Sequence, residues 1–354
     1  MGLRKLNSLI LLGTILLSAV SCKDDDDSTV SPSLDGYMTF SIPEFVKPEA
    51  TITLIPRGVT HPDGEELGYY WKVSPTMTQY DTTRFENGLD KYGNPSDGSF
   101  THTFSDTLKT YVVYGYAYAS GYASQSASAY CTVVSGGLDE SITNLGIGKD
   151  TPYVTVDGEK LYYTTVNGTD WLKMNIGNPT AGAPYVNCTA MNDVFGRFYS
   201  YEEALTVCPE GWTLPTSADW DALESAASEM KESKTTAAAL MANADFNDTR
   251  MWEYWPEVGD ITDATGIAML PVGYAMLGQK DANADNTNPN LEFTYPTANF
   301  KGYKEYAVFW TADKVADEEG MAYYRYLINK QPELLKGKGD TKTFGASVRC
   351  VRKK

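Results

Sequence analysis

Side chains that carry oxygen recur at regular positions in the segment 281–292, in a pattern that could bind a hard cation. Carboxylate and amide oxygens are the ligands that calcium takes in flexible protein loops. Asn286 stands where such a loop needs glycine, and Pro289 stiffens the chain, so a solvated loop is the favoured interpretation. A structural calcium ion is the alternative, and no other cofactor is predicted. The candidate ligands are Asp281, Asn283, Asp285 and Glu292.

Other residue types that commonly do chemistry are scarce or unpaired along the chain. The sequence has two histidines, His61 and His102, and neither lies near a second ligand at a spacing used for zinc. Carboxylates are plentiful, but no two of them are marked as facing each other across a cleft, as glycoside hydrolysis requires. We therefore expect a non-catalytic protein. A hydrolase is an alternative for which the sequence nominates no residue.

A run of tyrosines is the clearest candidate for binding another molecule. In TYVVYGYAYAS, residues 110–120, successive side chains of a strand would point to opposite faces, so Tyr114, Tyr116 and Tyr118 share one face. If the smaller side chains form the interior, these tyrosines make an exposed stripe that can stack on sugars or grip peptides. If the register is shifted by one residue, the tyrosines are interior. The sequence favours neither the exposed nor the interior placement of these tyrosines.

The first residues are expected to direct the chain out of the cytoplasm. A short apolar stretch follows Arg4 and Lys5, which is typical of a secretory signal and too short to span a bilayer as a helix. The stretch ends at Cys22, and the order AVSC at 19–22 resembles the lipobox of bacterial lipoproteins, whose cysteine is lipidated. A spare signal-peptide cysteine is the simpler alternative. We expect a signal peptide over 1–21.

An acidic run follows this cysteine and consists of Lys23, Asp24, Asp25, Asp26 and Asp27. It resembles the signal that sends Bacteroidota-type lipoproteins to the outer face of the outer membrane, and a solvated tether is the simpler alternative. The polar segment 22–35 is expected to be a flexible tether. These features predict a lipid-anchored protein of the outer membrane that is exposed at the cell surface.

Charge and length limit the partners and the number of domains. The formal net charge is −17 at pH 7, so binding to nucleic acid is not expected, because phosphate neutralisation needs a basic surface. The chain has 354 residues, of which 42% are hydrophobic, and it is too long for one typical core. About two globular domains are therefore expected.

The segment 36–135 is expected to be an all-β sandwich. Short alternating runs are divided by turn-rich stretches such as HPDGEE and YGNPSDGS. TITLIPRGVTHPDGEELGYYWKV, together with the later tyrosine-rich run, resembles the PKD-like branch of immunoglobulin-like domains. That resemblance places Tyr69, Trp71 and Val73 on the inner face of the central strand. A linker over 136–150 follows.

The remaining segment, 151–354, is expected to begin with a three-stranded meander. The dipeptides DG at 157–158 and NG at 167–168 supply the positive φ angles of two tight hairpins. Short aromatic strands fill the end of the chain, which predicts a mixed α+β domain. Two capping-box spacings predict helix starts, Ser200 with Glu203 and Thr216 or Ser217 with Asp219.

The stretch CPEGWTLPTSADWDAL, residues 208–223, closely resembles the signature of the FISUMP (major paralogous) domain. Further segments agree in order: GEKLYYTTVNGTDWLKMNI, FGRFYSYEEAL, DATGIAMLPVGY, and VFWTADK followed by GASVRCVRKK. The resemblance covers residues 153–354 and implies a C-type-lectin-like fold. The expected fold class is therefore multidomain, with an N-terminal all-β Ig/PKD-like sandwich followed by an α+β C-type-lectin-like (FISUMP) domain.

The cysteines that remain after lipidation fit this resemblance. Cys208 opens the signature and Cys350 lies in the last expected strand, so a disulfide between them would tie together the two ends of the domain. Buried thiols are the alternative. Cys131 and Cys188 are then either a second bridge that clamps the domains or two thiols. Sulfatase-modifying relatives need a reactive cysteine pair, which the C-terminal third lacks, so their activity is not expected.

Aromatic residues also border the irregular loops where lectin-like folds bind ligands. Trp252 and Trp255 are the ligand-binding candidates there, although core packing is the simpler role for each. Other aromatic residues of this region are Tyr274, Tyr295, Tyr303 and Tyr306.

These features favour a non-catalytic surface lipoprotein that binds glycan or peptide ligands. Its expected role is that of an accessory to a SusC/SusD-like TonB-dependent nutrient importer. The alternative is an adhesin or a fimbria-associated structural protein that presents its lectin-like domain to other cells. The expected partners are the outer membrane, contacted through the N-terminal lipid, an importer complex and the ligand.

Overall fold

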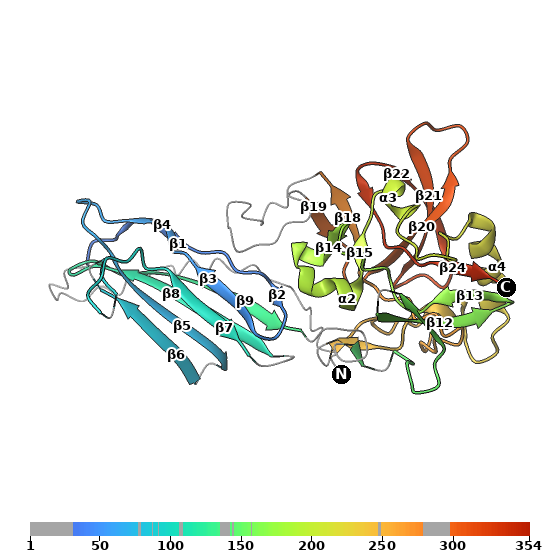
Figure 1. The fold of residues 1–354 in the computed structure, drawn as a ribbon, viewed down its shortest axis with the longest axis horizontal. Coiled ribbons are helices and arrows are strands. Elements are labelled where there is room, and N and C mark those ends of the chain that lie inside the picture. Colours follow the sequence, from blue (N-terminus) through green and yellow to red (C-terminus); the bar gives the residue numbers. More distant parts are fainter. Residues whose placement is uncertain are drawn as a thin grey trace, which may run out of the picture.

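The computed structural model describes residues 31–76, 79–86, 88–90, 92–105, 109–134, 142–143, 145–156, 158–246, 249–278 and 298–354. Cys22, the acidic run at 23–27 and the candidate calcium ligands at 281–292 lie outside the described residues. Within the described part, no helix is long and apolar enough to cross a membrane. The chain forms two β-rich parts, the first domain (31–134) and the second domain (142–354), as Figure 1 shows.

The first domain is a sandwich built from β1 (Asp35–Thr39), β2 (Phe45–Val46), β3 (Ala50–Leu54), β4 (Arg57–Thr60), β5 (Gly68–Thr76), β6 (Gln79–Phe85), β7 (Phe100–Phe104), β8 (Thr110–Tyr118) and β9 (Gln125–Val133). One layer is a five-stranded sheet with the order β2-β9-β8-β5-β6. The pairs β1–β4 and β3–β7 lie across from it. Side chains from all these pairs and from the large sheet meet in one core.

Trp71 is the centre of this core. It is fully buried on β5, and its indole N–H donates to the carbonyl oxygen of Gly98 at 2.8 Å. Gly115 of the neighbouring strand β8 faces the indole, and a Cβ at Gly115 would lie 2.7 Å from the ring. A larger residue would therefore clash, which fixes the register of β8. The inward residues of β8 are Tyr111, Val113, Gly115 and Ala117.

The second domain combines several small sheets with short helices. Its strands are β10 (Ile142–Thr143), β11 (Tyr153–Val156), β12 (Glu159–Val166), β13 (Thr169–Leu172), β14 (Ala183–Pro184), β15 (Arg197–Phe198), β16 (Asp245–Phe246), β17 (Thr249–Arg250), β18 (Tyr274–Leu277), β19 (Ala298–Lys301), β20 (Tyr306–Lys314), β21 (Met321–Ile328), β22 (Leu335–Asp340), β23 (Phe344–Gly345) and β24 (Val351–Lys353). Its α-helices are α2 (Asn192–Phe195), α3 (Tyr201–Ala204), α4 (Ser217–Ser228) and α5 (Thr236–Leu240).

The predicted meander is present as β11-β12-β13, and β24 adds a fourth strand to it. Gly158, Asn167 and Gly168 have positive φ angles, as tight hairpin turns require. Because β24 pairs with β13, the entry and the exit of the second domain lie side by side. The Cys208–Cys350 disulfide is present and ties the signature segment to the end of the chain.

Both predicted capping boxes are present. Ser200 caps α3, where its side chain and that of Glu203 exchange hydrogen bonds with each other's backbone N–H. Thr216, and not Ser217, caps α4, and the Thr216 backbone N–H donates to the Asp219 carboxylate at 2.9 Å. The buried face of α4 consists of Trp220, Leu223, Ala226 and Ala227.

The remaining cysteines, Cys131 and Cys188, are buried thiols. Cys131 lies in the core of the first domain, and Cys188 belongs to a cluster between the domains. Burial raises the pKa of the Cys131 thiol, which keeps this group protonated and unreactive. The sequence left open whether Cys131 and Cys188 form a disulfide, and in the structure they do not.

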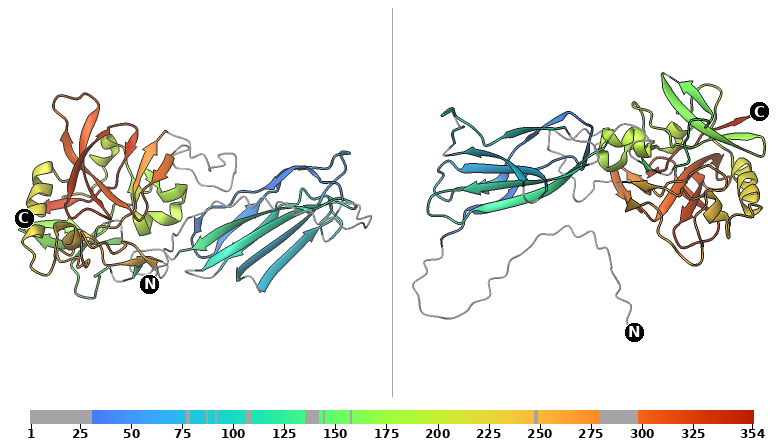
Figure 2. Two further views of the ribbon diagram at one scale, coloured as in Figure 1. Left: turned by 180° about the vertical axis from the view of Figure 1, so that it is seen from behind. Right: turned by 90° about the horizontal axis from the view of Figure 1, so that it is seen from below.

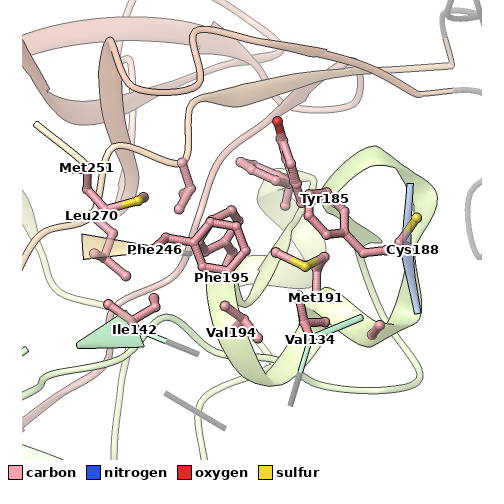
Figure 3. Packing of buried hydrophobic residues seen from close by; sticks show 14 of the residues in the cluster. Val134, Ile142, Tyr185, Cys188, Met191, Val194, Phe195, Phe246, Met251 and Leu270 are labelled. Carbon is pink, nitrogen blue, oxygen red and sulfur yellow. The ribbon is translucent and has the colours of Figure 1, made fainter. Parts of the chain in front are cut away.

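A hydrophobic cluster joins the two domains, and Figure 3 shows its packing. The ring of Phe45, from β2, lies 6.1 Å from both Tyr185 and Phe246 of the second domain. Lys47 and Asp193 add an ion pair of 3.0 Å between the domains. Figure 2 shows the same end-to-end arrangement of the domains from two further sides. The domains therefore share a packed junction.

Candidate functional site

The tyrosines of β8 lie on the outer face of the large sheet of the first domain. Tyr114, Tyr116 and Tyr118 are partly exposed, whereas the smaller residues between them are buried. Of the two registers that the alternation permits, the structure has the one that turns the tyrosines outward. Tyr70 of β5 lies opposite Tyr116 on the same face. We call the surface formed by Tyr70, Lys72, Arg84, Tyr114 and Tyr116 the tyrosine face.

The rings of the tyrosine face form a continuous aromatic surface. The ring centroids of Tyr70 and Tyr116 are 5.6 Å apart. Those of Tyr116 and Tyr114 are 6.5 Å apart, with ring planes only 24° from parallel. On the next strand, the exposed residues Ser126 and Ser128 lie opposite Tyr116 and Tyr114. Because serine is short, one side of the aromatic surface stays uncovered.

Two cations lie over these rings. The Lys72 ammonium is 5.2 Å from the centroid of Tyr70 and 5.8 Å from that of Tyr116. The Arg84 guanidinium is 4.9 Å from the centroid of Tyr70. Such contacts hold the cations at the surface and leave N–H donors beside the aromatic rings. The tyrosine face therefore offers stacking surfaces, phenolic hydroxyls and positive charge together.

Tyr118 differs from the other tyrosines of the predicted stripe. Its ring lies over Gly68, where an added Cβ would come within 2.5 Å of the ring, and its hydroxyl donates to the carbonyl oxygen of Phe85 at 3.3 Å. Burial raises the pKa of its phenol. Tyr118 therefore packs along the strands rather than presenting an open ring, and we exclude it from the tyrosine face.

The predicted tryptophans of the second domain lie mainly in its core. Trp252 is fully buried, and its indole N–H donates to the carbonyl oxygen of Met269 at 2.8 Å, so it cannot contact a ligand in this structure. The prediction that Trp252 binds a ligand is therefore wrong, because its ring is part of the core. Trp255 packs against the same core, and the Lys330 ammonium covers its ring at 4.5 Å. Trp255 therefore offers little open surface.

A second aromatic surface lies on the second domain, and the sequence did not predict it as a unit. Tyr324 and Phe344 stack with centroids 4.8 Å apart, and Tyr274 stacks on Phe344 at 5.4 Å. Tyr324 lies flat on Gly337, since an added Cβ there would be 2.3 Å from the ring. The partly exposed rings that make up this aromatic patch are Tyr274, Tyr306, Tyr324, Tyr326 and Phe344.

Two signals in the sequence could have indicated this patch. The run MAYYRYLI at 321–328 alternates, so Tyr324 and Tyr326 share one face of β21. In LKGKGD at 335–340, glycines stand at every second position of β22 and leave room for rings on one face. Neither run contains a turn or a known motif that would mark it as part of a surface. Only the pairing of β21 with β22 brings these tyrosines and glycines together.

The comparisons with known proteins identify the second domain. Residues 157–352 match the Fibrobacter succinogenes major domain, and this match covers more than half of the chain. The chain belongs to this family. The family expected from the signature at 208–223 is thereby confirmed. No curated protein and no solved structure matches the chain.

Arg349 joins three separate segments of the major domain. It is completely buried, and its guanidinium donates to the carbonyl oxygens of Leu172 at 2.9 Å and of Ile267 at 2.6 Å. It also donates to the side-chain oxygen of Asn175 at 2.9 Å. Burial lowers the pKa of Arg349. The guanidinium keeps its charge nevertheless, because its ordinary pKa is so high.

Asp263 and Lys173 interact electrostatically with Arg349. Burial raises the pKa of the Asp263 carboxyl to about 7, although Lys173 and Arg349 act in the opposite direction. The carboxylate accepts a hydrogen bond of 2.8 Å from the backbone N–H of Ala268. Burial also lowers the pKa of the Lys173 ammonium. The family motifs DATGIAML, LKMNI and GASVRC therefore meet in one buried group of charges.

Metal binding has no support within the described residues. No cluster of histidine, cysteine, aspartate and glutamate there could hold a metal ion. The candidate calcium ligands Asp281, Asn283, Asp285 and Glu292 lie outside that part, so the calcium prediction stays a prediction.

Proposed function

We propose that this chain is a non-catalytic lipoprotein of the outer membrane that binds glycan or peptide ligands at the cell surface. The observation that carries the proposal is the tyrosine face, where partly exposed phenol rings lie together with two cations. Contiguous exposed aromatic surfaces often mark sites that bind ligands or other proteins. Rigid aromatic residues supply contact area at a small cost in conformational entropy.

The chemistry of the tyrosine face suits saccharides and extended peptides. The apolar faces of sugar rings stack on phenol rings, and the Tyr hydroxyls and the Lys72 ammonium can hydrogen bond to sugar hydroxyls. A peptide would use the same rings for its side chains and the cations for its carboxylates. The aromatic patch of the second domain has similar chemistry and supports the same role.

The proposed location rests on the first residues of the chain. Lipidation of Cys22 would anchor the protein, and the acidic tether after it would lift both domains away from the membrane. A ligand-binding protein at that position would serve a TonB-dependent importer of the SusC/SusD kind, which is the partner we propose. The net charge of −17 suits a protein that stays clear of an anionic membrane surface.

The finer fold assignments belong to the same proposal. A fully buried tryptophan on the central strand of a two-layer sandwich supports a PKD-like, immunoglobulin-like first domain. The pairing of β13 with β24 places the entry and the exit of the second domain side by side, and the Cys208–Cys350 disulfide ties the signature segment to the exit. Both features support a C-type-lectin-like second domain.

Arrays of glycans and peptides test the binding role. We expect the purified full chain to bind a restricted set of ligands and the Tyr116→Ala variant to lose that set. Tyr37→Ala is the matched control, because Tyr37 is 80% exposed but lies on β1, outside the tyrosine face. The proposal is wrong if no ligand binds, or if both variants bind as the wild type does. Co-purification of an importer from outer membranes tests the proposed partner.

A further inference from the structure

A cavity of about 620 Å³ opens beside the meander of the major domain. The segment 146–152 forms one wall, and Tyr163, Thr164 and Thr165 of β12 form another. Lys173 and Gly266 complete the lining. This volume lies in the range of pockets that hold small molecules. The cavity is separate from the tyrosine face, which lies on the other domain.

Lys173 contributes a buried ammonium group to this cavity. The residue is only 4% exposed, although it lines an open cavity. Its ammonium donates to the carbonyl oxygen of Gly266, and it makes no other side-chain hydrogen bond with the described residues. A Cβ added at Gly146 or at Gly266 would lie 3.7 Å from its nitrogen, so these glycines keep the space around the ammonium open. An ammonium has three donors, which leaves two for a ligand.

The charges around Lys173 are unbalanced. Arg349 lies behind it as a second, completely buried cation. Asp263 is the carboxyl that acts on both cations. Lys149 and Asp150 also line the cavity and carry opposite charges. Two buried cations therefore share one buried carboxyl. Buried cations without a matching anion are unfavourable, so an anion that enters the cavity would be stabilised there.

We infer that this cavity binds a monoanionic sugar acid, whose carboxylate accepts hydrogen bonds from the Lys173 ammonium. An ammonium acts as a point charge that can bind a carboxylate or a phosphate, so inorganic phosphate is the comparison ligand that tests the carboxylate assignment. The Thr164 hydroxyl donates to the carbonyl oxygen of Thr265 and keeps lone pairs that can accept from a sugar hydroxyl. Tyr163 lines the cavity through its strand, since its ring packs against Trp212 at 5.8 Å on the other face of β12.

Gly148 provides a matched pair of variants for testing this site. It lines the cavity, its φ angle is not in the left-handed region, and a Cβ added there would meet nothing within 4 Å. Gly148→Glu therefore introduces a negative charge at the cavity without a clash, and Gly148→Gln introduces the same shape without the charge. Lys173→Gln removes the proposed ligand-binding cation.

The experiment is a calorimetric titration of the full chain with sodium glucuronate, and with acetate, inorganic phosphate and glucose for comparison. We expect one glucuronate per chain, weaker binding of acetate and phosphate, and none of glucose. Gly148→Glu and Lys173→Gln should each weaken glucuronate binding about tenfold or more, and Gly148→Gln about twofold or less. Tyr116→Ala should leave it unchanged, which separates this site from the tyrosine face.

Several results would overturn the inference. One is the absence of saturable glucuronate binding by the wild type. Another is equal weakening by Gly148→Glu and Gly148→Gln, which would show that the charge in the cavity is irrelevant. Tighter binding of phosphate than of glucuronate would refute the carboxylate assignment. If Lys173→Gln does not fold, the Gly148 pair still decides the question.

Discussion

Arg349 is a buried cation whose hydrogen bonds hold together segments from both ends of the major domain. Replacement by methionine keeps most of the volume but leaves the carbonyl oxygens of Leu172, Ile267 and Ala268 and the Asn175 side chain without the Arg349 donor. We expect Arg349→Met to lower the free energy of unfolding by about 3–5 kcal/mol. Urea unfolding measures this loss of stability.

Arg250→Met is the control, because Arg250 is exposed and its contact with Asp245 is long, at 3.9 Å. The loss of this contact should cost about 1 kcal/mol or less. Equal effects would contradict the role of Arg349.

Asp263 should make the stability of the major domain depend on pH. Its pKa is about 7 in the folded state and about 3.9 in an unfolded chain, so the folded state binds an additional proton between these values. The free energy of unfolding therefore falls as the pH rises from about 4 to about 7, by at most about 1.4 kcal/mol per pH unit from this group. Asp263→Asn should remove that part of the slope in urea unfolding at several pH values. Asp150→Asn, at an exposed carboxylate, serves as the control, and an unchanged slope in Asp263→Asn would refute the assignment.

Individual residues could be predicted from the sequence where the pattern is local. Alternation places Tyr114 and Tyr116 on one face but permits two registers, and the contact of Gly115 with the Trp71 ring selects one of them. Lys173 and Asp263 are far apart in the sequence, and nothing in either segment indicates the other. Burial of Trp252 also depends on tertiary packing, which local pattern does not contain.

At the scale of elements, the Cys208–Cys350 disulfide closes a loop of 142 residues. The chain-entropy model gives such a loop a stabilisation of about 5 kcal/mol. We expect the double variant Cys208→Ala, Cys350→Ala to lose up to that amount in chemical unfolding. A reductant should destabilise the wild type and leave the double variant unchanged. A wild type that is insensitive to full reduction would contradict this expectation.

Local elements were predicted well because their determinants are short. The two hairpins depend on the dipeptides at 157–158 and 167–168, and the starts of α3 and α4 depend on capping boxes four residues long. The addition of β24 to the meander was not predicted, because it pairs residues at opposite ends of the domain. The aromatic patch escaped prediction for the same reason.

At the scale of the whole molecule, the interdomain cluster should fix the relative position of the two domains. We expect Phe45→Ala to loosen this junction, since the loss of a buried phenylalanine costs about 3–5 kcal/mol. Small-angle scattering should then report a broader distribution of distances. Phe100→Ala is the control, because Phe100 is as buried as Phe45, at 8% exposure, but lies within the first domain. A scattering profile that Phe45→Ala leaves unchanged would refute a fixed junction.

The two-domain, β-rich organisation followed from length, turn spacing and the family signature. The sequence did not predict how the domains meet, because Phe45, Tyr185 and Phe246 belong to different elements and share no local pattern. Cell-surface location and lipidation depend on residues outside the described structure and stay predictions.

The proposed function depends most directly on ligand binding at the tyrosine face. The most direct test is a calorimetric titration of the ligand selected on the arrays into the wild type and into the Tyr70→Ala, Tyr116→Ala double variant. Each lost stacking contact should cost about 0.5–1.5 kcal/mol, so we predict about fivefold weaker binding or more for the double variant. Equal affinities of the two proteins would contradict the claim.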